Sequence, residues 1–173
     1  LQEGNGIPND KKEYAKYIKL AANNGHIKAM IQYAKVAYFG DGIPIDKHEA
    51  AKYLKIAVDN GFFDSMILYA DMLKKGDGIP VDSKESAKYF KMAADKGNLS
   101  AMVMYGQMLR DGDGIPVDRK ESSKYLKIAA DKEESLAMLL LGLNLFEDDS
   151  NEDNKKEALK YVKSSADKGN VTS

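Results

Sequence analysis

The sequence predicts an all-α fold, a solenoid of antiparallel helix pairs with 36-residue repeats. The pattern Gly-Xaa-Gly-Ile-Pro recurs at this spacing, at residues 4–8, 40–44, 76–80 and 112–116. A fixed period in this range is typical of solenoids, whose units bury their apolar faces against their neighbours. No segment shows the alternation of a β-strand, and the connections are only a few residues long. Successive helices are therefore expected to be antiparallel neighbours.

The helix that follows each Gly-Ile-Pro turn is named helix B here. It begins with Asp or Asn, followed by Glu three residues later, a variant of the capping box. These pairs are Asp10/Glu13, Asp46/Glu49, Asp82/Glu85, Asp118/Glu121 and Asn154/Glu157. A glycine then predicts the helix end through a left-handed C-cap. This glycine is present as Gly25, Gly61, Gly97 and Gly169, whereas Glu133 takes its place in the fourth copy.

One face of helix B is predicted to pack closely against a neighbouring helix. A tyrosine and, four residues later, two small residues place large beside small on that face, so another helix can approach. The tyrosines are Tyr17, Tyr53, Tyr89, Tyr125 and Tyr161. The pairs that follow are Ala21/Ala22, Ala57/Val58, Ala93/Ala94, Ala129/Ala130 and Ser165/Ala166.

Helix A follows each helix B and carries methionine and tyrosine in register. It is expected at Ile27–Phe39, Phe63–Lys75, Leu99–Asp111 and Ser135–Glu147. The shared residues are Met30, Met66, Met102, Met138 and then Tyr33, Tyr69, Tyr105, Leu141. We expect one repeat domain over 1–173, with helix B of one repeat at 9–24 and four A–B pairs at about 26–60, 62–96, 98–132 and 134–168. Because the chain begins in the middle of a repeat, we interpret it as a piece of a longer protein.

Residues 101–130 read Ala-Xaa3-Tyr-Gly-Xaa5-Gly-Xaa-Gly-Ile-Pro-Xaa-Asp-Xaa2-Glu-Ser-Xaa2-Tyr-Xaa3-Ala-Ala. This pattern resembles the Sel-1-like repeat, a relative of the tetratricopeptide repeat, and it recurs over almost the whole chain. The chain departs from the family pattern at Ala37, Leu73, Leu109 and Leu145, where the family often has Tyr. It also mostly has Tyr before the small residue of helix A, where the family often has Leu. These exchanges are apolar and leave the predicted fold unchanged.

The resemblance implies a right-handed superhelix and an adaptor role. Such adaptors hold partner proteins in complexes of protein quality control, signalling or host interaction. One branch of the family is rich in cysteine, with a disulfide in each repeat and reported binding of β-lactam compounds, and a chain without cysteine argues against that branch. The family has no shared catalytic residues, so the resemblance assigns none here.

Composition narrows the class of protein further. The 173 residues are 43% hydrophobic and 31% charged, with a net charge of −1 and no cysteine. Disulfides, thiolate metal sites and a cysteine nucleophile are excluded, and no bulk charge favours nucleic acid or a membrane surface. No apolar run approaches the length of a membrane span. We expect a cytoplasmic protein, although two Asn-Xaa-Ser/Thr sequons leave the secretory pathway open.

Positions of helix A that vary between repeats are expected to be exposed, because packing does not fix them. They lie at i, i+4, i+7 and i+11, on one helical face. The first three of each set are predicted to bind a partner in a concave groove: Lys28, Gln32, Lys35; Asp64, Leu68, Asp71; Ser100, Met104, Gln107; and Leu136, Leu140, Leu143. The last members are Phe39, Lys75, Asp111 and Glu147. Leu68, Met104 and Leu140 form an apolar row that suits an apolar helix face or an extended segment. In the alternative, this column packs against helix B of its own repeat.

The last helix A differs from the others because it is apolar nearly all round. Its leucines are Leu136, Leu139, Leu140, Leu141, Leu143 and Leu145. We expect a further repeat or a partner to cover it on more sides. The turn that follows, residues 147–154, has lost its glycines and become acidic. Capping units are atypical in this way, and a solvated loop is preferred there over a site for a basic partner or an ion.

Two lysine columns on helix B predict a basic stripe on the outer side of the solenoid. They are Lys16, Lys52, Lys88, Lys124, Lys160 and Lys19, Lys55, Lys91, Lys127, Lys163. The preferred interpretation is a soluble face balanced by Asp and Glu of the same helices. The alternative is docking on an acidic filament, an acidic protein tail or an anionic lipid surface.

The sequence contains no arrangement typical of catalysis, and we expect no cofactor or metal. The two histidines, His26 and His48, lie outside any metal-binding or nucleophile pattern. The run 111–114 fails as a calcium loop, because Ile115 and Pro116 stand where an oxygen ligand and a glycine are needed. Tyrosines at core spacing without a basic excess do not predict nucleic-acid binding.

We therefore expect a protein–protein interaction scaffold and not an enzyme. Two other functions stay open at this point. The chain could be a structural component built into a large assembly, docked through its lysine face and its apolar last helix A. It could also be the regulatory repeat region of a longer signalling enzyme, such as a kinase.

Overall fold

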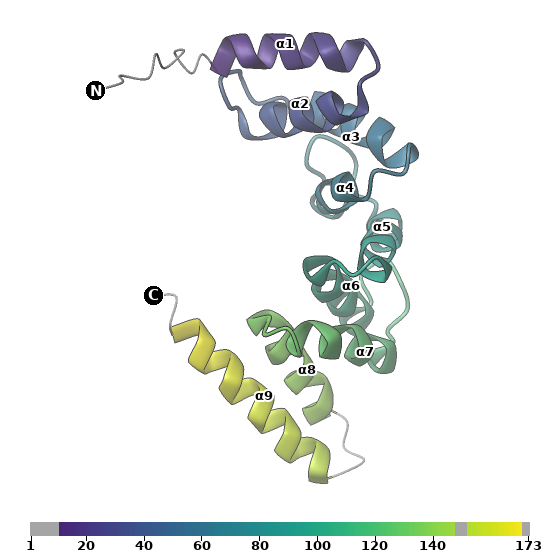
Figure 1. The fold of residues 1–173 in the computed structure, drawn as a ribbon. Coiled ribbons are helices and arrows are strands. Elements are labelled where there is room, and N and C mark those ends of the chain that lie inside the picture. Colours follow the sequence, from purple (N-terminus) through teal and green to yellow (C-terminus); the bar gives the residue numbers. More distant parts are fainter. Residues whose placement is uncertain (1–10, 148–151, 171–173) are drawn as a thin grey trace, which may run out of the picture. The chain divides into compact units, whose positions relative to one another are not determined.

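The computed structural model describes residues 11–147 and 152–170, and these residues form nine α-helices and no β-strand (Figure 1). The predicted all-α fold of helix pairs is confirmed. The chain divides into two compact units between Val81 and Asp82. The first Gly-Xaa-Gly-Ile-Pro turn, at residues 4–8, lies outside the described residues, and so does Asp10.

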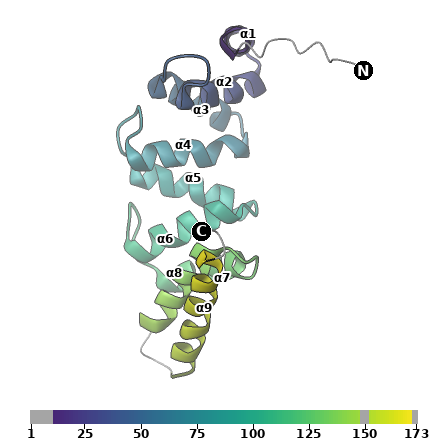
Figure 2. The same cartoon turned by 90° about the vertical axis from the view of Figure 1, so that its left-hand side faces the viewer.

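The first unit contains α1 to α4, in which each helix contacts the next. Short turns join them, so consecutive helices run in opposite directions (Figure 2). Their bounds are α1 Lys11–Asn23, α2 Ile27–Phe39, α3 Lys47–Asp59 and α4 Phe63–Lys75. The observed bounds of α2 and α4 equal those predicted for helix A.

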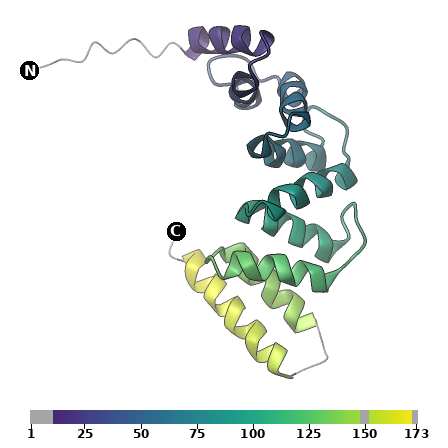
Figure 3. The same ribbon diagram turned by 45° about the vertical axis from the view of Figure 1, so that its right-hand side comes forward.

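The second unit contains α5 to α9, with α9 alongside α8 (Figure 3). Their bounds are α5 Ser83–Asp95, α6 Leu99–Asp111, α7 Arg119–Ala130, α8 Ser135–Glu147 and α9 Glu152–Asn170. The bounds of α6 and α8 again equal the prediction. Within this unit α8 contacts α6, α7 and α9, so three helices pack around it.

The second glycine of each described turn lies against the helix B of the preceding repeat. A Cβ atom on Gly78 would lie 2.5 Å from the carbonyl carbon of Lys47, and one on Gly42 would lie 2.6 Å from that of Lys11. Both glycines also have positive φ, 75° and 82°. Only glycine combines this backbone conformation with so close an approach.

The residue between the two glycines adds an ion pair to the same contact. Asp77 pairs with Lys47 at 2.8 Å, and Asp41 pairs with Lys11 at 2.6 Å. The hydroxyl of Tyr38 also donates to Asp77 at 2.8 Å. In the first unit, the turn therefore joins successive repeats by close packing and by charge.

The predicted helix caps are confirmed at three of the five positions. Asp46, Asp82 and Asp118 accept hydrogen bonds from the backbone N–H three residues on, at 2.8 to 2.9 Å. The prediction for Asn154 is wrong, because α9 already begins at Glu152. The turn before α9 lacks glycine and proline, and Glu152 and Asp153 in its first turn suit the positive end of the helix dipole.

The predicted ends of helix B show two departures. Gly25, Gly61 and Gly97 have the left-handed φ of a C-cap. Gly169 does not end its helix, since α9 continues to Asn170. Glu133 keeps the left-handed conformation with φ of 67°, as the only non-glycine residue with positive φ in the described ranges. The fourth helix B thus ends like the others, in spite of the substitution.

The core is formed by the shared columns of the repeat. The helix A methionines are buried, as are Ala57, Ala93 and Ala129. Tyr33 meets Tyr53 edge to face at 5.3 Å between ring centroids, and Tyr105 meets Tyr125 at 5.1 Å. The packing prediction fails for Tyr17, which is exposed because no helix A precedes α1 in the described residues.

Candidate partner-binding surfaces

In the first unit, the predicted groove residues of α2 and α4 are exposed or half-buried. Lys28, Gln32 and Lys35 are exposed on α2. On α4, Asp64 is exposed, whereas Leu68 and Asp71 are half-buried. Asp71 accepts a hydrogen bond from Lys75 at 2.7 Å, one turn further along the helix. This face is mixed in charge and open to a partner.

The structure brings Gln32 and Lys35 together around a hollow in the first unit. Tyr14 of α1 and Phe39 of α2 complete much of its wall, and its volume is about 470 Å³. Both aromatic side chains are exposed. The hollow therefore offers apolar surface beside a cation on the predicted face.

In the second unit, the same column is only partly exposed. Ser100 is exposed, whereas Met104 and Gln107 are half-buried. On α8, Leu136 is exposed and Leu143 is half-buried. Leu140 is buried, which corrects the expected apolar row of Leu68, Met104 and Leu140. The packing of α8 against three helices covers Leu140, so it presents no surface to a partner.

The two lysine columns of helix B have different environments. The first column, from Lys16 to Lys160, is exposed in every helix B. In the second column, Lys19 and Lys91 take part in contacts between repeats. Lys19 pairs with Glu49 of the next helix B at 2.7 Å and lies 5.1 Å from the ring centroid of Tyr33. The first column therefore has the properties of the predicted basic stripe throughout, and in the second column Lys127 and Lys163 are exposed as well.

Glu49 is the centre of this contact in the first unit. Its carboxylate accepts the hydroxyl proton of Tyr33 at 2.6 Å, in addition to the Lys19 ion pair. Burial alone would raise the pKa of Glu49, but the bonds from Lys19 and Tyr33 outweigh it and lower the pKa. The bond to Glu49 likewise raises the pKa of Lys19. The Glu of the capping box therefore joins two repeats instead of reaching back to its own helix end.

Lys91 is in the equivalent position of the second unit. It pairs with Glu121 at 3.6 Å and donates to the hydroxyl of Tyr125 at 2.8 Å. That hydroxyl donates in turn to Asp95 at 2.6 Å. Burial, followed by the bond to Asp95, raises the pKa of Tyr125. In both units a lysine of one helix B thus contacts the next repeat. Lys19 donates to Glu49 in the first unit, whereas Lys91 donates to Tyr125 in the second.

A groove recurs beside the lysine columns at the same register in each unit. In the first unit it has a volume of about 740 Å³ and is lined by Lys12, Lys16 and Lys19 with Ile43. In the second unit it has about 670 Å³, and the residues 72 positions further along line it: Lys84, Lys88, Lys91 and Ile115. Acidic residues line both grooves too, Glu13, Asp46 and Glu49 in the first unit and Asp82, Glu85 and Asp95 in the second, so the grooves are mixed in charge.

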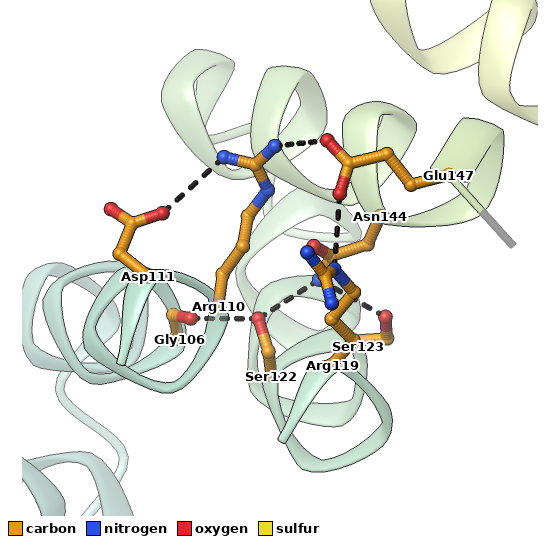
Figure 4. A network of polar contacts seen from close by, with 8 residues as sticks. All are labelled: Gly106, Arg110, Asp111, Arg119, Ser122, Ser123, Asn144 and Glu147. Carbon is orange, nitrogen blue, oxygen red and sulfur yellow. Dashed lines mark hydrogen bonds and ion pairs between the residues drawn. The ribbon is translucent and has the colours of Figure 1, made fainter. Parts of the chain in front are cut away.

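A polar network joins α6, α7 and α8, which sequence reasoning missed (Figure 4). The amide of Asn144 donates to Ser122 at 2.9 Å, and Ser122 donates to the carbonyl of Gly106 at 2.7 Å. Asn144 occupies a column that holds Val36, Met72 and Met108 in the other copies of helix A. A polar residue in an apolar column was the signal that could have revealed this network.

Charged residues extend the network towards the surface. Glu147 accepts from Arg110 at 2.5 Å and from Arg119 at 3.0 Å. These bonds, with Arg110 first, lower the pKa of Glu147. Glu147 therefore links α8 to both α6 and α7, as the aspartate of a Gly-Asp-Gly turn links repeats in the first unit. Of the acidic turn that follows, residues 148–151 lie outside the described residues.

The described residues include no cluster suited to a metal ion and no helix suited to crossing a membrane. Within 11–147 and 152–170, no group of three or more His, Cys, Asp or Glu side chains is arranged to hold a metal ion. None of the helices in these ranges combines the length and the apolarity that crossing a bilayer requires. His48 contacts the carbonyl of Gly78 through Nδ1 at 3.1 Å, within the contact between repeats.

Comparison with known protein families identifies the repeat. The Sel1 repeat model matches residues 1–26, 27–62, 63–98, 99–133 and 135–170. The chain belongs to the Sel1 repeat family. Proteins with Sel1 repeats are generally interaction scaffolds without catalytic activity. No curated protein matches the sequence of the chain.

Solved structures of Sel1 repeat proteins share the fold. A protective antigen of uropathogenic Escherichia coli strains with the SLR fold has a TM-score of 0.86 at 26% identity, over 97% of this chain and 36% of the antigen. A Sel1 repeat protein from Oxalobacter formigenes has a TM-score of 0.81 at 22% identity, over 94% of this chain and 67% of its own. Cysteine-rich protein B of Helicobacter pylori reaches 0.56 at 18% identity, over 71% of this chain and 93% of its own. The chain thus spans about a third of the length of the antigen.

Proposed function

We propose that this Sel1 repeat chain is a scaffold that binds partner proteins through the variable face of helix A, and that it is not an enzyme. The observation that carries the proposal is the exposure of this face. Lys28, Gln32 and Lys35 are solvent-exposed on α2, and two of them line a hollow with exposed aromatic side chains. Side chains that vary between repeats and do not pack are free to be selected for a partner.

Charge reversal on α4 tests this proposal. Asp64→Lys combined with Asp71→Lys should weaken or abolish binding to partners recovered by crosslinking and mass spectrometry with the wild-type chain. Asp59→Lys combined with Asp131→Lys changes the net charge equally at the ends of two helices B, and it should leave binding intact. Circular dichroism checks that both variants fold. If the Asp64/Asp71 variant binds the partners as well as the control variant and the wild type do, the helix A face is not the binding face.

A second candidate function is docking to an acidic protein segment along helix B. The first lysine column supports it, because this column is exposed in every helix B and borders a groove at the same register in each unit. The columns are not equally available, since Lys19 and Lys91 already pair with acidic residues of the next repeat. Binding of a poly-glutamate peptide should weaken steeply as salt rises, because exposed charges are screened. Affinity that does not depend on salt would exclude this function.

A further inference from the structure

An apolar stripe remains exposed on α8, although three helices pack against α8. Leu136, Leu139 and Phe146 are exposed and Leu143 is half-buried. Their spacing of i, i+3, i+7 and i+10 places them on one face along the whole helix. The other copies of helix A have polar residues at the positions of Leu136 and Leu143: Lys28/Lys35, Asp64/Asp71 and Ser100/Gln107. The complete stripe is therefore specific to α8.

Within the second unit, the corresponding face of α6 is covered at Val103, although Ser100 is exposed and Gln107 is half-buried. Val103 of α6 corresponds to Leu139 of α8, and α6 contacts α8. Val103 is 6% exposed, whereas Leu139 is 36% exposed and Phe146 is 62% exposed. The position that is buried in α6 is thus open in α8.

The neighbouring helix α9 presents an open face as well. Ala87 and Ala94 of α5, a helix B that contacts α6, are fully buried at 0%. Their equivalents on α9 are Leu159, which is 55% exposed, and Ala166, which is also exposed. Helix α8 packs against α6 and α7. A further helix that packed against α8 and α9 in the same way would contact both open faces. The two faces together form one helix-binding surface, the α8–α9 face.

The residues of the α8–α9 face differ from those that receive a helix A inside the repeat array. Leu159 stands where the other helices B have the small residues Ala15, Ala51, Ala87 and Ser123, which permit close approach. A larger side chain holds the incoming helix further out, and Leu136 and Leu143 widen the apolar floor. The surface therefore suits a helix with a broader apolar seam than helix A has.

Charge on the rim of α9 indicates the polar side of that helix. Lys156 and Lys163 lie three residues before and four residues after Leu159, so they share its face. Both are exposed, and the contact of Lys156 with Asp153 is an exposed pair at 3.4 Å. Pairs of this kind hold a side chain only weakly. The two lysines therefore favour acidic side chains on the incoming helix.

We propose that the α8–α9 face binds an amphipathic α-helix of another protein, with an apolar seam and acidic residues along the flank that faces α9. This inference rests on the proposed scaffold function and names the chemistry of one partner. It uses the helix-in-groove mode, in which apolar anchors recur at i, i+3 and i+7.

A designed peptide of three heptads serves as the probe. It carries Leu at three seam positions of each heptad (a, d and e), Glu on one flank and Ala elsewhere, with a fluorescent label for anisotropy. One control peptide has Lys in place of Glu, and the other has the same composition with the seam scrambled. The Glu peptide should bind the 173-residue chain about tenfold more tightly than either control. Absent binding, or equal binding of all three peptides, would overturn the proposal.

Variants of the chain locate the binding surface. Phe146→Ser with Leu159→Ser should weaken binding of the Glu peptide about tenfold, and both residues are exposed, so folding should be retained. Ile128→Ser removes an exposed apolar side chain from α7 and should change nothing. Unchanged binding by the double variant would overturn the assignment. A dimer in sedimentation equilibrium that the double variant abolishes would assign the face to a second copy instead.

The two proposals fail separately. If the Asp64/Asp71 variant loses its partners while the peptide does not bind, the scaffold function stands and the α8–α9 inference fails. If the peptide binds through Phe146 and Leu159 while the Asp64/Asp71 variant keeps its partners, the site on helix A fails instead.

Discussion

At the scale of single residues, Gly78 shows why the turn needs two glycines. The first glycine of each described turn ends helix A with a left-handed φ, 73° at Gly76. The second approaches the backbone of the preceding helix B so closely that a Cβ would overlap Lys47. The sequence motif thus combines a helix end with a contact between repeats. The period alone predicted the turn but not this second contact.

Replacing Gly78 separates backbone strain from steric overlap. Gly61 has nearly the same φ, 79° against 75°, but a Cβ there would meet nothing within 4 Å. Gly61→Ala should cost about 1–2 kcal/mol of unfolding free energy from the left-handed backbone. Gly78→Ala should cost about 1–3 kcal/mol more from the overlap. Urea denaturation measures both, and equal losses would refute the role of the close contact.

Tyr38 predicts how stability changes at high pH. Burial, followed by its hydrogen bond to Asp77, raises the pKa of Tyr38 to about 12, against about 10 in an unfolded chain. The fold favours the protonated hydroxyl, so this contribution is complete below pH 10 and is lost as the pH rises to 12. The unfolding temperature should therefore fall less steeply over this pH range in Tyr38→Phe than in the wild type. Parallel profiles, relative to their values at pH 8, would contradict the prediction.

At the scale of elements, α7 ends in the same way as the other helices B although its glycine is missing. Glu133 adopts φ of 67° and pairs with Lys168 of α9 at 2.9 Å. Because both the chain geometry and the next helix require this turn, the tertiary structure imposes the left-handed conformation on a residue that disfavours it. Sequence alone showed only that the glycine series was interrupted.

Substitutions at Glu133 test this strain. Glu133→Gly should raise the unfolding temperature by about 2 °C, because it relieves the strain and loses only an exposed ion pair. Glu133→Ala loses the same ion pair and keeps the strain, so it should give no increase. Differential scanning calorimetry of the two variants provides the comparison. If both variants unfold below the wild type by similar amounts, the ion pair outweighs the strain.

At the scale of the whole molecule, stability should vary along the array. Each repeat packs mainly on its neighbours, so a helix with fewer neighbours opens more readily. In the described residues, the strong contacts of α1 are with α2 and those of α9 are with α8, whereas α6 has α5, α7 and α8 around it.

Hydrogen exchange of the 173-residue chain measures this gradient. Backbone amides of α1 and α9 should exchange faster than those of α6, because they open without disturbing the rest of their unit. Exchange of the α9 amides should become slower when the acidic amphipathic peptide is bound, since that peptide covers the open face of α9. Uniform protection across all the helices would instead indicate a single cooperative unit.

The repeat columns made most of the fold predictable from sequence, because each column recurs several times. The helix A bounds, the three aspartate caps and the buried methionines all follow from one pattern. Predictions failed where the pattern was applied to a unit that lacks a neighbour or a turn signal. Tyr17 is exposed, Asn154 is not a cap and Gly169 does not end its helix. Leu140 was expected at the surface and is buried, in a helix that contacts α6, α7 and α9.

The sequence by itself determined the helix pairs, their order and their caps, because turn chemistry and helical periodicity are local properties. Only the tertiary structure decided which faces remain open, because exposure depends on which neighbours a helix has. It placed Asn144 in a buried network, used Lys19 and Lys91 to join repeats, and left the apolar stripe of α8 uncovered. Those open faces, and not the repeat itself, carry the information about partners.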